Sequence, residues 1–398
     1  MSKLEELIQE LCPDGVETFP LEECCNILDK KRKPVTKNSR EKGEYPYYGA
    51  NGVQDYVSDY IFNGKFVLVG EDGSVITKSG TPVVTWAEGK IWVNNHAHVI
   101  EEKSGTMLRY LYFYIQTIDV TSLIHGNIPK LTGRDFRSLK IALPPLEIQR
   151  EIVSILDNFT ELTAELTAEL TARKTQYTYY RDKLLANSYK GEIKQLEECC
   201  DSIADGDHQA PPKADSGVPF ITISDIDERH EINLNVTKYV PDEYYNRLAD
   251  KRRPQKGDVL YTVVGSYGIP VYISENKRFV FQRHIAILRP NNAVIDSRYL
   301  YHAMNGTAFH RQADLAAKGA AQKTIGLASL AKMTVPVPPL DVQNRIVNVL
   351  DNFEKICSDL NIGLPAEIEA RQKQYEYYRD KLLTFAETGN TILNGTEL

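Results

Sequence analysis

The sequence predicts an α+β protein in which two α/β domains are separated by two long antiparallel helices, a coiled coil with pseudo-twofold symmetry. Three observations lead to this prediction. Two long stretches of the chain occur twice in the same order, each has the apolar spacing of a helix, and the segments between them consist of short strand-like runs. A chain of 398 residues is long enough for domains of this kind.

Two repeated motifs define the helical modules. PPLEIQREIVSILDNF at residues 144–159 returns as PPLDVQNRIVNVLDNF at 338–353, and QYTYYRDKLL at 176–185 returns as QYEYYRDKLL at 374–383. Matches of this length in the same order indicate an internal duplication rather than chance. The segments between the modules do not resemble each other closely. The duplication therefore preserves the helical modules, which form a repeated frame, while the variable segments that the frame carries differ.

A third match places the domain boundaries. LEECC stands at residues 21–25 and again at 196–200, near the start of each variable segment. Because a helix precedes LEECC in both places, we expect the C-terminal end of the chain to pack near the N-terminus. The predicted parts are an N-terminal helix (1–20), a first variable domain (21–143), a central helical spacer (144–190), a second variable domain (191–337) and a C-terminal helical spacer (338–398).

The first module has the pattern of one long helix. Apolar residues recur at steps of three and four, and the following TELTAELTAELTA consists largely of strong helix formers, with Leu at every fourth position. A helix over about 146–187 would be roughly 60 Å long, at about 1.5 Å per residue. In the second module, Gly363 and Pro365 within NIGLP predict a break or kink.

A long amphipathic helix needs a partner for its apolar stripe, and the other module is the obvious candidate. The alternative is that both modules are ordinary bundle helices within one domain. The Pro-Pro pairs and the flanking domains isolate each module and favour the coiled coil. The residues expected on the packing and docking faces of the spacer helices are Ile152, Leu156, Phe159, Leu166, Tyr180, Ile346, Leu350, Phe353 and Tyr378.

The variable segments have the pattern of mixed α/β structure, with short strand-like runs punctuated by Gly, Asn and Asp. In the first, strands are expected within YPYYGANGVQDYV, KFVLVGEDG, TPVVTWA and IWVNNHAHVI, and RYLYFYIQTI (109–118) is expected to be a helix. In the second, strands are expected within VPFITISDI, GDVLYTVVGSYGIPVYI and FVFQRHIAILRP, and DSRYLYHAMNG (296–306) is expected to be the equivalent helix.

The net charge of −7 argues mildly against nucleic-acid binding, but an acidic scaffold can mask local basic patches. KKRKPVTKNSREK at residues 30–42 is such a patch, and Lys and Arg also gather at 251–253, 277–278 and 283. Lys and Arg neutralise phosphates, and Asn, Gln and Arg contact base edges in the major groove. The alternatives are a solvated loop at 30–42 and, for a single Asn or His, an ordinary surface position.

Together these motifs resemble the specificity subunit of type I restriction-modification systems. The matching features are PPL-xx-Q-xx-I-V-xx-LD-x-F twice, QY-x-YYRDKLL twice and the TAEL tetrapeptide repeat, and YPYYGANG, EDGS, NNHA, FITISDI and GDVLYTVVGSYG are similar to parts of that family's recognition domains. The resemblance covers essentially the whole chain, and the tetrapeptide repeat is its most specific mark. Members of the family often carry Glu before the motif's Gln, where this chain has Ile148 and Val342.

The resemblance implies a non-catalytic DNA-recognition subunit of a methyltransferase and endonuclease complex that serves phage defence. Each variable segment would be a target-recognition domain that reads one half of a bipartite, asymmetric DNA target. The helices would set the gap between the halves and dock two methyltransferase (modification) subunits, which hold S-adenosylmethionine. Restriction subunits, which supply endonuclease and translocase activity, would join the full complex, and this chain itself would need no cofactor.

The nominated DNA contacts lie in polar or basic loops of the two variable segments. GNIPKLT and GAAQKT occupy equivalent places before the two helical modules, which favours their lysines. The target sequence itself does not follow from the residues, because base recognition depends on geometry. The nominated residues are Lys31, Arg32, Lys33, Tyr48, Asn51 and Lys130 in the first segment and Thr222, Ser224, Ser266, Tyr267, Arg283 and Lys323 in the second.

The sequence contains none of the catalytic motifs GxxxxGK[ST], NPPY, DPPY or GxSxG, so we expect no catalytic residue. His96 and His98 alternate along one strand-like run, but no third ligand accompanies them in sequence, and we expect no metal. The six cysteines include no CxxC pair and are expected to be reduced, mostly buried thiols.

The chain has no signal-peptide pattern and no apolar run near the roughly 20 residues that span a bilayer, which predicts a cytoplasmic protein. Two hypotheses on function follow. The first is the DNA specificity subunit, and the alternative is a coiled-coil scaffold whose globular domains bind protein or carbohydrate. The basic segment favours the first, and a DNA affinity that falls steeply with salt would distinguish them.

Overall fold

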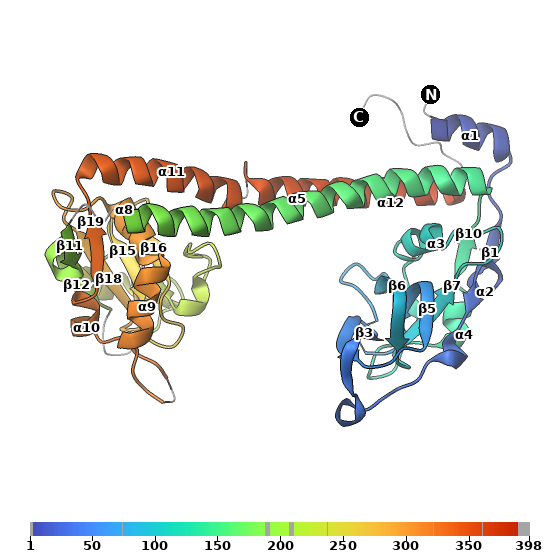
Figure 1. Ribbon diagram of the computed structural model, residues 1–398, viewed down its shortest axis with the longest axis horizontal. Coiled ribbons are helices and arrows are strands. Elements are labelled where there is room, and N and C mark those ends of the chain that lie inside the picture. Colours follow the sequence, from blue (N-terminus) through green and yellow to red (C-terminus); the bar gives the residue numbers. More distant parts are fainter. Residues whose placement is uncertain are drawn as a thin grey trace. The chain divides into compact units, whose positions relative to one another are not determined.

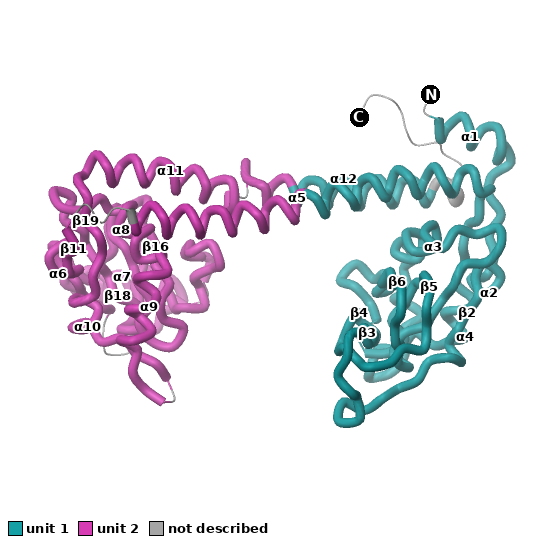
Figure 2. The backbone as a smooth tube through the Cα atoms, viewed as in Figure 1, with its two compact units in different colours: residues 1–165, 368–398 teal, residues 166–367 magenta. Residues whose placement is uncertain are grey.

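The structure is a computed structural model that describes residues 3–73, 75–187, 192–206, 211–236, 238–320, 322–359 and 361–388. The chain divides into two compact units (Figure 2): unit 1 comprises residues 1–165 and 368–398, and unit 2 comprises residues 166–367. Each unit therefore contains one variable segment and parts of both repeated modules. The predicted boundary at 190/191 and residues 389–398 of the predicted C-terminal spacer lie outside the described residues.

Unit 1 is built on a six-stranded mixed sheet with the strand order β2-β7-β5-β6-β3-β4, in which only β3 and β6 pair in parallel among the described strands. Side chains alternate between its faces. On β5, Val67 and Val69 join the core shared with the helices, whereas Phe66 and Leu68 fill a core on the other face. The strands are β2 (Asn26–Ile27), β3 (Lys42–Gly49), β4 (Gly52–Val57), β5 (Phe62–Gly70), β6 (Val84–Val93) and β7 (Ala97–Glu101).

The helix expected within 109–118 is α3 (Leu108–Ile115), which packs between this sheet and the long helices (Figure 1). As expected, both ends of the described chain contribute to one core, since Leu4 of the N-terminal helix and Leu383 near the C-terminus belong to the same cluster. The remaining elements of unit 1 are α1 (Lys3–Leu11), β1 (Thr18–Pro20), α2 (Leu21–Cys24), η1 (Asp29–Lys31), η2 (Lys37–Ser39), η3 (Thr121–Leu123), β8 (Ile124–His125), β9 (Lys130–Leu131), α4 (Gly133–Arg137) and β10 (Lys140–Ala142).

Unit 2 contains a four-stranded sheet, β12-β18-β15-β16, and a three-stranded sheet, β14-β13-β17, so its sheets differ from the sheet of unit 1. The strands are β11 (Glu192–Gln195), β12 (Cys200–Asp205), β13 (Val218–Ile221), β14 (Tyr239–Val240), β15 (Val259–Thr262), β16 (Pro270–Tyr272), β17 (Val280–Phe281), β18 (Ile285–Pro290) and β19 (Thr334–Val337). The helices are α6 (Leu196–Cys199), η5 (Ile223–Asp225), α7 (Asp242–Arg247), η6 (Asp250–Arg252), α8 (Ser297–Met304), α9 (Thr307–Ala316) and α10 (Leu327–Ala331).

The frame around these different sheets is the same in both units. A short antiparallel ladder joins the start of each variable segment to its end, β1 with β10 in unit 1 and β11 with β19 in unit 2. The Leu of each LEECC motif, Leu21 and Leu196, is fully buried at the start of a short helix. The structure thus confirms that the chain repeats its frame and varies its contents.

The predicted first long helix is confirmed as α5 (Leu146–Asn187). The second module is two helices, α11 (Leu340–Ser358) and α12 (Leu364–Thr388), so the break predicted at NIGLP is confirmed as well. A Cβ atom at Gly363 would lie 2.6 Å from the carbonyl oxygens of Asp359 and Lys355, so glycine permits the close turn. Pro365 lies in the first turn of α12, where a missing N–H costs nothing. No helix in the described part of the chain is long and apolar enough to cross a membrane.

The same aromatic pair joins the long helices in each unit. In unit 1, Phe159 of α5 stacks on Tyr378 of α12, with ring centres 5.5 Å apart. In unit 2, Phe353 of α11 stacks on Tyr180 of α5, with ring centres 5.8 Å apart. Of the other nominated spacer residues, Leu166 is half-buried, and the buried ones are Ile152, Leu156, Ile346 and Leu350.

The Gln of each PPL motif joins a long helix to its variable segment. The Gln149 side chain is fully buried, donates to the carbonyl oxygens of Gly105 and Pro144 at 3.1 and 2.8 Å, and accepts the N–H of Met107 at 2.8 Å. In unit 2, Gln343 makes the same three hydrogen bonds, and its partners are Val294, Pro338 and Asp296. An ion pair is repeated beside each Gln, Arg109 with Asp157 and Arg298 with Asp351.

Candidate nucleic-acid interface

The basic segment of unit 1 folds as two short helical turns, η1 and η2, joined by an extended stretch. Lys31 and Lys33 are exposed. The backbone at Lys33 is held in place, because Trp92 Nε1 donates to its carbonyl oxygen at 2.6 Å, and the Lys33 ammonium lies 5.9 Å from the centre of the Trp92 ring. These two cations are available to phosphate groups on a backbone that the sheet orders.

Two nominated residues of unit 1 lie inside the protein instead. The Arg32 side chain is 12% exposed, and its guanidinium donates to Glu71 Oε2 at 2.5 Å and to the carbonyl oxygen of Ala97 at 2.7 Å. Tyr48 is 9% exposed, near the end of β3 where it pairs with Val53. Protein covers most of both side chains: Arg32 ties the basic segment to Glu71, and Tyr48 packs in a core cluster of the sheet. Their nomination as DNA contacts stays a prediction.

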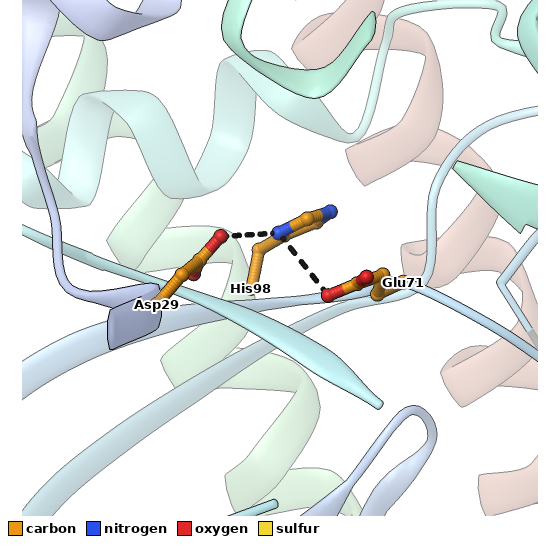
Figure 3. A group of neighbouring side chains, drawn as sticks. All are labelled: Asp29, Glu71 and His98. Carbon is orange, nitrogen blue, oxygen red and sulfur yellow. Dashed lines mark hydrogen bonds and ion pairs between the residues drawn. The ribbon is translucent and has the colours of Figure 1, made fainter. Parts of the chain in front are cut away.

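Arg32 belongs to a buried polar cluster formed by Asp29, Glu71 and His98 (Figure 3). His98 Nδ1 lies 2.7 Å from Asp29 Oδ2 and 3.7 Å from Glu71 Oε2. Asp29 Oδ1 accepts the N–H of Val99 at 3.0 Å. Burial raises the pKa of Asp29, but these hydrogen bonds and the charges of His98 and Arg32 outweigh it and hold the pKa below its ordinary value.

Glu71 brings two of the nominated cations together. Its Oε2 accepts from Arg32, and its Oε1 lies 3.3 Å from Lys130 Nζ, whose side chain is 45% exposed. Lys130 therefore presents its ammonium to solvent from β9 while Glu71 orients it. Asn51 occupies the exposed turn between β3 and β4. The exposed nominated residues of unit 1 are thus Lys31, Lys33, Asn51 and, in part, Lys130.

In unit 2, three nominated residues line one pocket of about 610 Å³. Thr222 and Ser224 lie where β13 passes into η5, and Ser266 lies in the turn between β15 and β16. The Oγ atoms of Thr222 and Ser224 are 2.9 Å apart, and the pocket also has apolar walls that include Ile221 and Ile285. A few hydroxyl groups on apolar walls form a surface that orients a planar polar ligand.

The other three nominated residues of unit 2, Tyr267, Arg283 and Lys323, directly adjoin lining residues in the chain. Lys323 Nζ lies 6.0 Å from the centre of the Tyr267 ring. Arg283 is exposed and stands in the chain between Gln282 and His284, which both line the pocket. The structure therefore places three of the six nominated residues in the lining of one pocket and the other three next to lining residues in the chain.

The sequence prediction missed Gln282, His284 and Gln322, which line the same pocket. A Gln amide can donate to and accept from an adenine edge, so these side chains belong among the candidates for base contacts. Their only sequence signal was proximity, because they directly adjoin Arg283 and Lys323. When two polar residues are adjacent in the sequence, only the geometry of the turn shows which of them faces the pocket.

Other basic residues of unit 2 serve its own structure. Sequence clusters at 251–253 and 277–278 were expected to favour DNA, and four of their five basic side chains pair with nearby carboxylates. The pairs are Arg252 with Asp205 at 3.8 Å, Arg253 with Asp250 at 3.6 Å, Lys277 with Glu275 at 2.6 Å and Arg278 with Asp242 at 2.5 Å. Their charges are thus partly balanced before any phosphate approaches.

Among the residues that the structure describes, two groups of His and carboxylate side chains lie close enough to share a cation: Asp29, Glu71 and His98 in unit 1, and His302, Asp351 and Glu354 in unit 2. In each, an arginine already pairs with the carboxylates. Arg32 does so in unit 1, and Arg298 contacts both Asp351 and Glu354 in unit 2. In each group, one guanidinium therefore offsets one of the two carboxylate charges.

All six cysteines are free thiols, and four of them are buried, which confirms the expected burial. Burial raises the pKa of Cys24 to about 11 and that of Cys25 to about 12. A thiol with so high a pKa is a poor nucleophile, so these side chains act as core residues.

Both variable segments match one known family. Residues 13–173 and 190–370 match the family model described as the type I restriction modification DNA specificity domain. A putative type I restriction enzyme specificity subunit of Haemophilus influenzae is 35% identical over 399 residues, which cover 96% of this chain and 98% of that protein. A type I restriction enzyme specificity subunit of Escherichia coli is 34% identical over 311 residues, 71% of this chain and 72% of that protein.

Two solved structures share the fold. The S subunit of a type I restriction-modification system from M. genitalium matches with a TM-score of 0.55 and 14% identity, over 93% of this chain and 97% of its own. A chain from a study of complex assembly and conformational transition in a type I restriction-modification system matches with a TM-score of 0.56 and 18% identity, over 94% and 98%. At these identities the likeness concerns the fold alone.

Proposed function

Because this chain belongs to the family of type I restriction-modification specificity subunits, which are DNA-recognition components without catalytic activity, we propose that it reads a bipartite, asymmetric DNA target. The segment at 21–143 reads one half and the segment at 191–337 reads the other. The observation that carries this proposal is one frame repeated around two different sheets. Because the two recognition segments present different surfaces on the same repeated frame, they suit two different half-sites.

The candidate contacts of the two segments differ in chemistry. Unit 1 exposes lysines, Lys31, Lys33 and Lys130, beside Asn51. Unit 2 offers hydroxyl and amide groups around one pocket, and Arg283 and Lys323 adjoin its lining residues in the chain. Cations bind phosphates in any sequence, whereas amides and hydroxyls distinguish base edges, so we expect both kinds of contact in each half.

We propose that residues 144–190 and 338–398 act as the spacer, an antiparallel coiled coil with pseudo-twofold symmetry. Its support is the equivalent stack of Phe on Tyr in each unit, in which each repeat supplies one ring. The buried Ile152, Leu156, Ile346 and Leu350 would hold this spacer together from within.

The spacer would also dock two methyltransferase subunits, which bind S-adenosylmethionine, and restriction subunits would join them. An exposed Tyr–Lys pair occurs once in each unit and supports two equal docking sites. Tyr179 is 58% exposed with Lys183 Nζ 5.4 Å from its ring centre, and Tyr377 is 46% exposed with Lys381 Nζ 4.2 Å away. Since the proposed ligand is DNA, the proposed place of action is the cytoplasm.

Methylome mapping tests this proposal directly. The chain is expressed with methyltransferase subunits in a host without other DNA methylation, and modified bases are mapped across the genome. We expect a single motif of two unequal specific blocks with a constant gap. Methylation without such a motif contradicts the proposal. DNA affinity should also fall steeply with salt, whereas salt-independent binding to a protein or carbohydrate would support a scaffold instead.

A further inference from the structure

We propose that His98 is a positioning residue for DNA recognition by unit 1, and that it acts in its doubly protonated form. It joins the two segments that carry the exposed lysines, without touching DNA itself. The inference rests on the proposed function and adds to it the residue that orders the phosphate-binding surface.

His98 connects η1 to β9. Its Nδ1 lies 2.7 Å from Asp29 Oδ2 in η1, and its Nε2 lies 3.1 Å from the carbonyl oxygen of Leu131 in β9. The ring stacks on Phe136 of α4, with centres 4.1 Å apart and planes 4° apart, and the residue is 1% exposed. Since η1 leads into Lys31 and Lys33, and Leu131 follows Lys130, one side chain fixes both lysine-bearing segments.

Both partners of the ring accept hydrogen bonds and donate none. A carbonyl oxygen has no proton to give, and Asp29 is a carboxylate because its pKa is lowered. Each ring nitrogen must therefore donate, and only the imidazolium form donates from both. A neutral ring would turn a lone pair toward Asp29 or toward Leu131 inside the protein, which costs the full penalty of an unsatisfied buried group.

The charged groups around the ring come from each element packed against it. Glu71 follows β5, and Arg32 and Lys130 both pair with it. On α4, Gly133 and Phe136 face the ring, and neither titrates. His96, on the turn before β7, pairs with Asp72. The cluster contains three positive groups and two negative ones, so it carries one net positive charge when His98 is doubly protonated. The positive groups are Arg32, Lys130 and His98, and the negative groups are Asp29 and Glu71. This net charge is lost when His98 loses its proton.

Two consequences for DNA binding follow from this arrangement. Loss of the His98 proton removes the positive charge beneath the lysines, and it also breaks a bond between η1 and β9. Both effects weaken phosphate binding by unit 1 as pH rises, while the surface of unit 2 has no equivalent dependence on this residue.

The protonation state is measurable in the native full-length chain. Histidine labelled with ¹⁵N in its ring reports by NMR whether one or both nitrogens carry a proton. We expect both ring nitrogens of His98 to carry a proton in the folded chain, because both face acceptors. A singly protonated His98 at neutral pH overturns the inference, and this measurement depends on neither DNA nor a substitution.

The positioning role is tested by selecting bound duplexes from a library with randomised central base pairs, using the full chain. The native protein should enrich two blocks. His98→Phe keeps the stack on Phe136 but loses both donors, and should reduce enrichment of the unit 1 block, with affinity for the natively selected duplex about tenfold lower. His96→Gln is the matched control, because His96 also pairs with a carboxylate but its side chain is 47% exposed; it should keep both blocks.

The outcomes separate the two proposals. If the native chain enriches no block, the proposed function fails. If His98→Phe folds and keeps both blocks at native affinity, or loses both equally, the positioning role fails. If His98→Phe does not fold, the native chain decides: selection below and above the pH at which the ¹⁵N signals show His98 losing its proton should weaken the block that Lys130→Ala weakens. Unchanged enrichment of that block overturns the inference.

Discussion

At the scale of single residues, Gln149 and Gln343 explain why both PPL motifs contain Gln at the same place. Each is fully buried and satisfies three backbone groups where a variable segment meets a long helix. A buried side chain amide with all its bonds made adds stability, but its loss leaves those backbone groups without partners. The motif therefore encodes a joint between domain and helix.

Gln149→Ala tests this joint. The change leaves the N–H of Met107 and the carbonyl oxygens of Gly105 and Pro144 without their partner, and we expect it to lower the free energy of unfolding of unit 1 by about 2–3 kcal/mol. The measurement is the urea midpoint followed by circular dichroism. Gln372→Ala, on the exposed surface of α12, should change the free energy of unfolding by no more than about 0.5 kcal/mol. Equal effects of the two variants would refute the role.

Asp351 makes the stability of unit 2 depend on pH in the acidic range. Burial raises its pKa, but the hydrogen bond from His302 and the charge of Arg298 outweigh burial, and the pKa lies below the ordinary value. A carboxyl group whose pKa is lower in the folded state stabilises the fold above its unfolded pKa of about 3.9, and this contribution disappears as pH falls through the folded value. The native protein should therefore lose stability below about pH 4.

Asp351→Asn should remove part of that acid dependence. The variant is less stable than the native chain at pH 7, and the difference between them shrinks as pH falls below about 4, where the native carboxyl also becomes neutral. Thermal melts of both proteins between neutral and acidic pH measure it. A stability difference that stays constant over the whole range would show that Asp351 contributes through packing alone.

At the scale of elements, the TAEL repeat in α5 is a unit of length. Four residues add about 6 Å of helix and turn it about 40° beyond a full circle, so removing one unit nearly preserves the facing of the side chains. B-DNA rises about 3.4 Å per base pair. Deleting Thr163–Leu166 should therefore shorten the gap of the target by one or two base pairs and leave both half-sites unchanged.

Methylation-site mapping of the deletion variant checks this prediction. We expect the second module to adjust between α11 and α12, at residues 359 and 361–363, which leaves the stacks at Phe159 and Phe353 in place. Deleting the identical unit Thr167–Leu170 is the matched variant and should give the same shortened gap. Altered half-sites in either variant would contradict the prediction that the length of α5 sets only the gap between the half-sites.

The elements were predictable where their signals are local. The span of α5 follows from Leu, Glu and Ala at helical spacing, and the break before α12 follows from Gly363 and Pro365. The cluster around His98 was not predictable, because Asp29 and His98 stand 69 positions apart and belong to different elements. Arg32 shows the same limit: it looks like its basic neighbours in sequence, and only the position of Glu71 turns it inward.

At the scale of the whole molecule, the duplication keeps what joins domain to helix and changes what faces a ligand. The repeated features are Gln149 and Gln343, the Arg–Asp pairs and the stacks of Phe on Tyr. The sheets and candidate contact surfaces between them differ. Because the contacts between domain and helix are the same in both units while the candidate DNA-contacting surfaces differ, we expect that one recognition domain can be exchanged without disturbing the other.

Replacing residues 20–143 with the corresponding domain of a relative tests this modularity. Gln149 and Asp157 stay in the chimera, while their partners Gly105, Met107 and Arg109 are replaced by residues of the donor. A donor with the equivalent of Arg109 is chosen for that reason. We expect one half-site to become that of the donor, while the second half-site and the gap stay as they were, because unit 2 keeps its sheets and its pocket. Methylome mapping of the chimera is the measurement, and a replacement of 191–337 should change the opposite half. If either chimera changes both halves, the two domains do not read DNA independently.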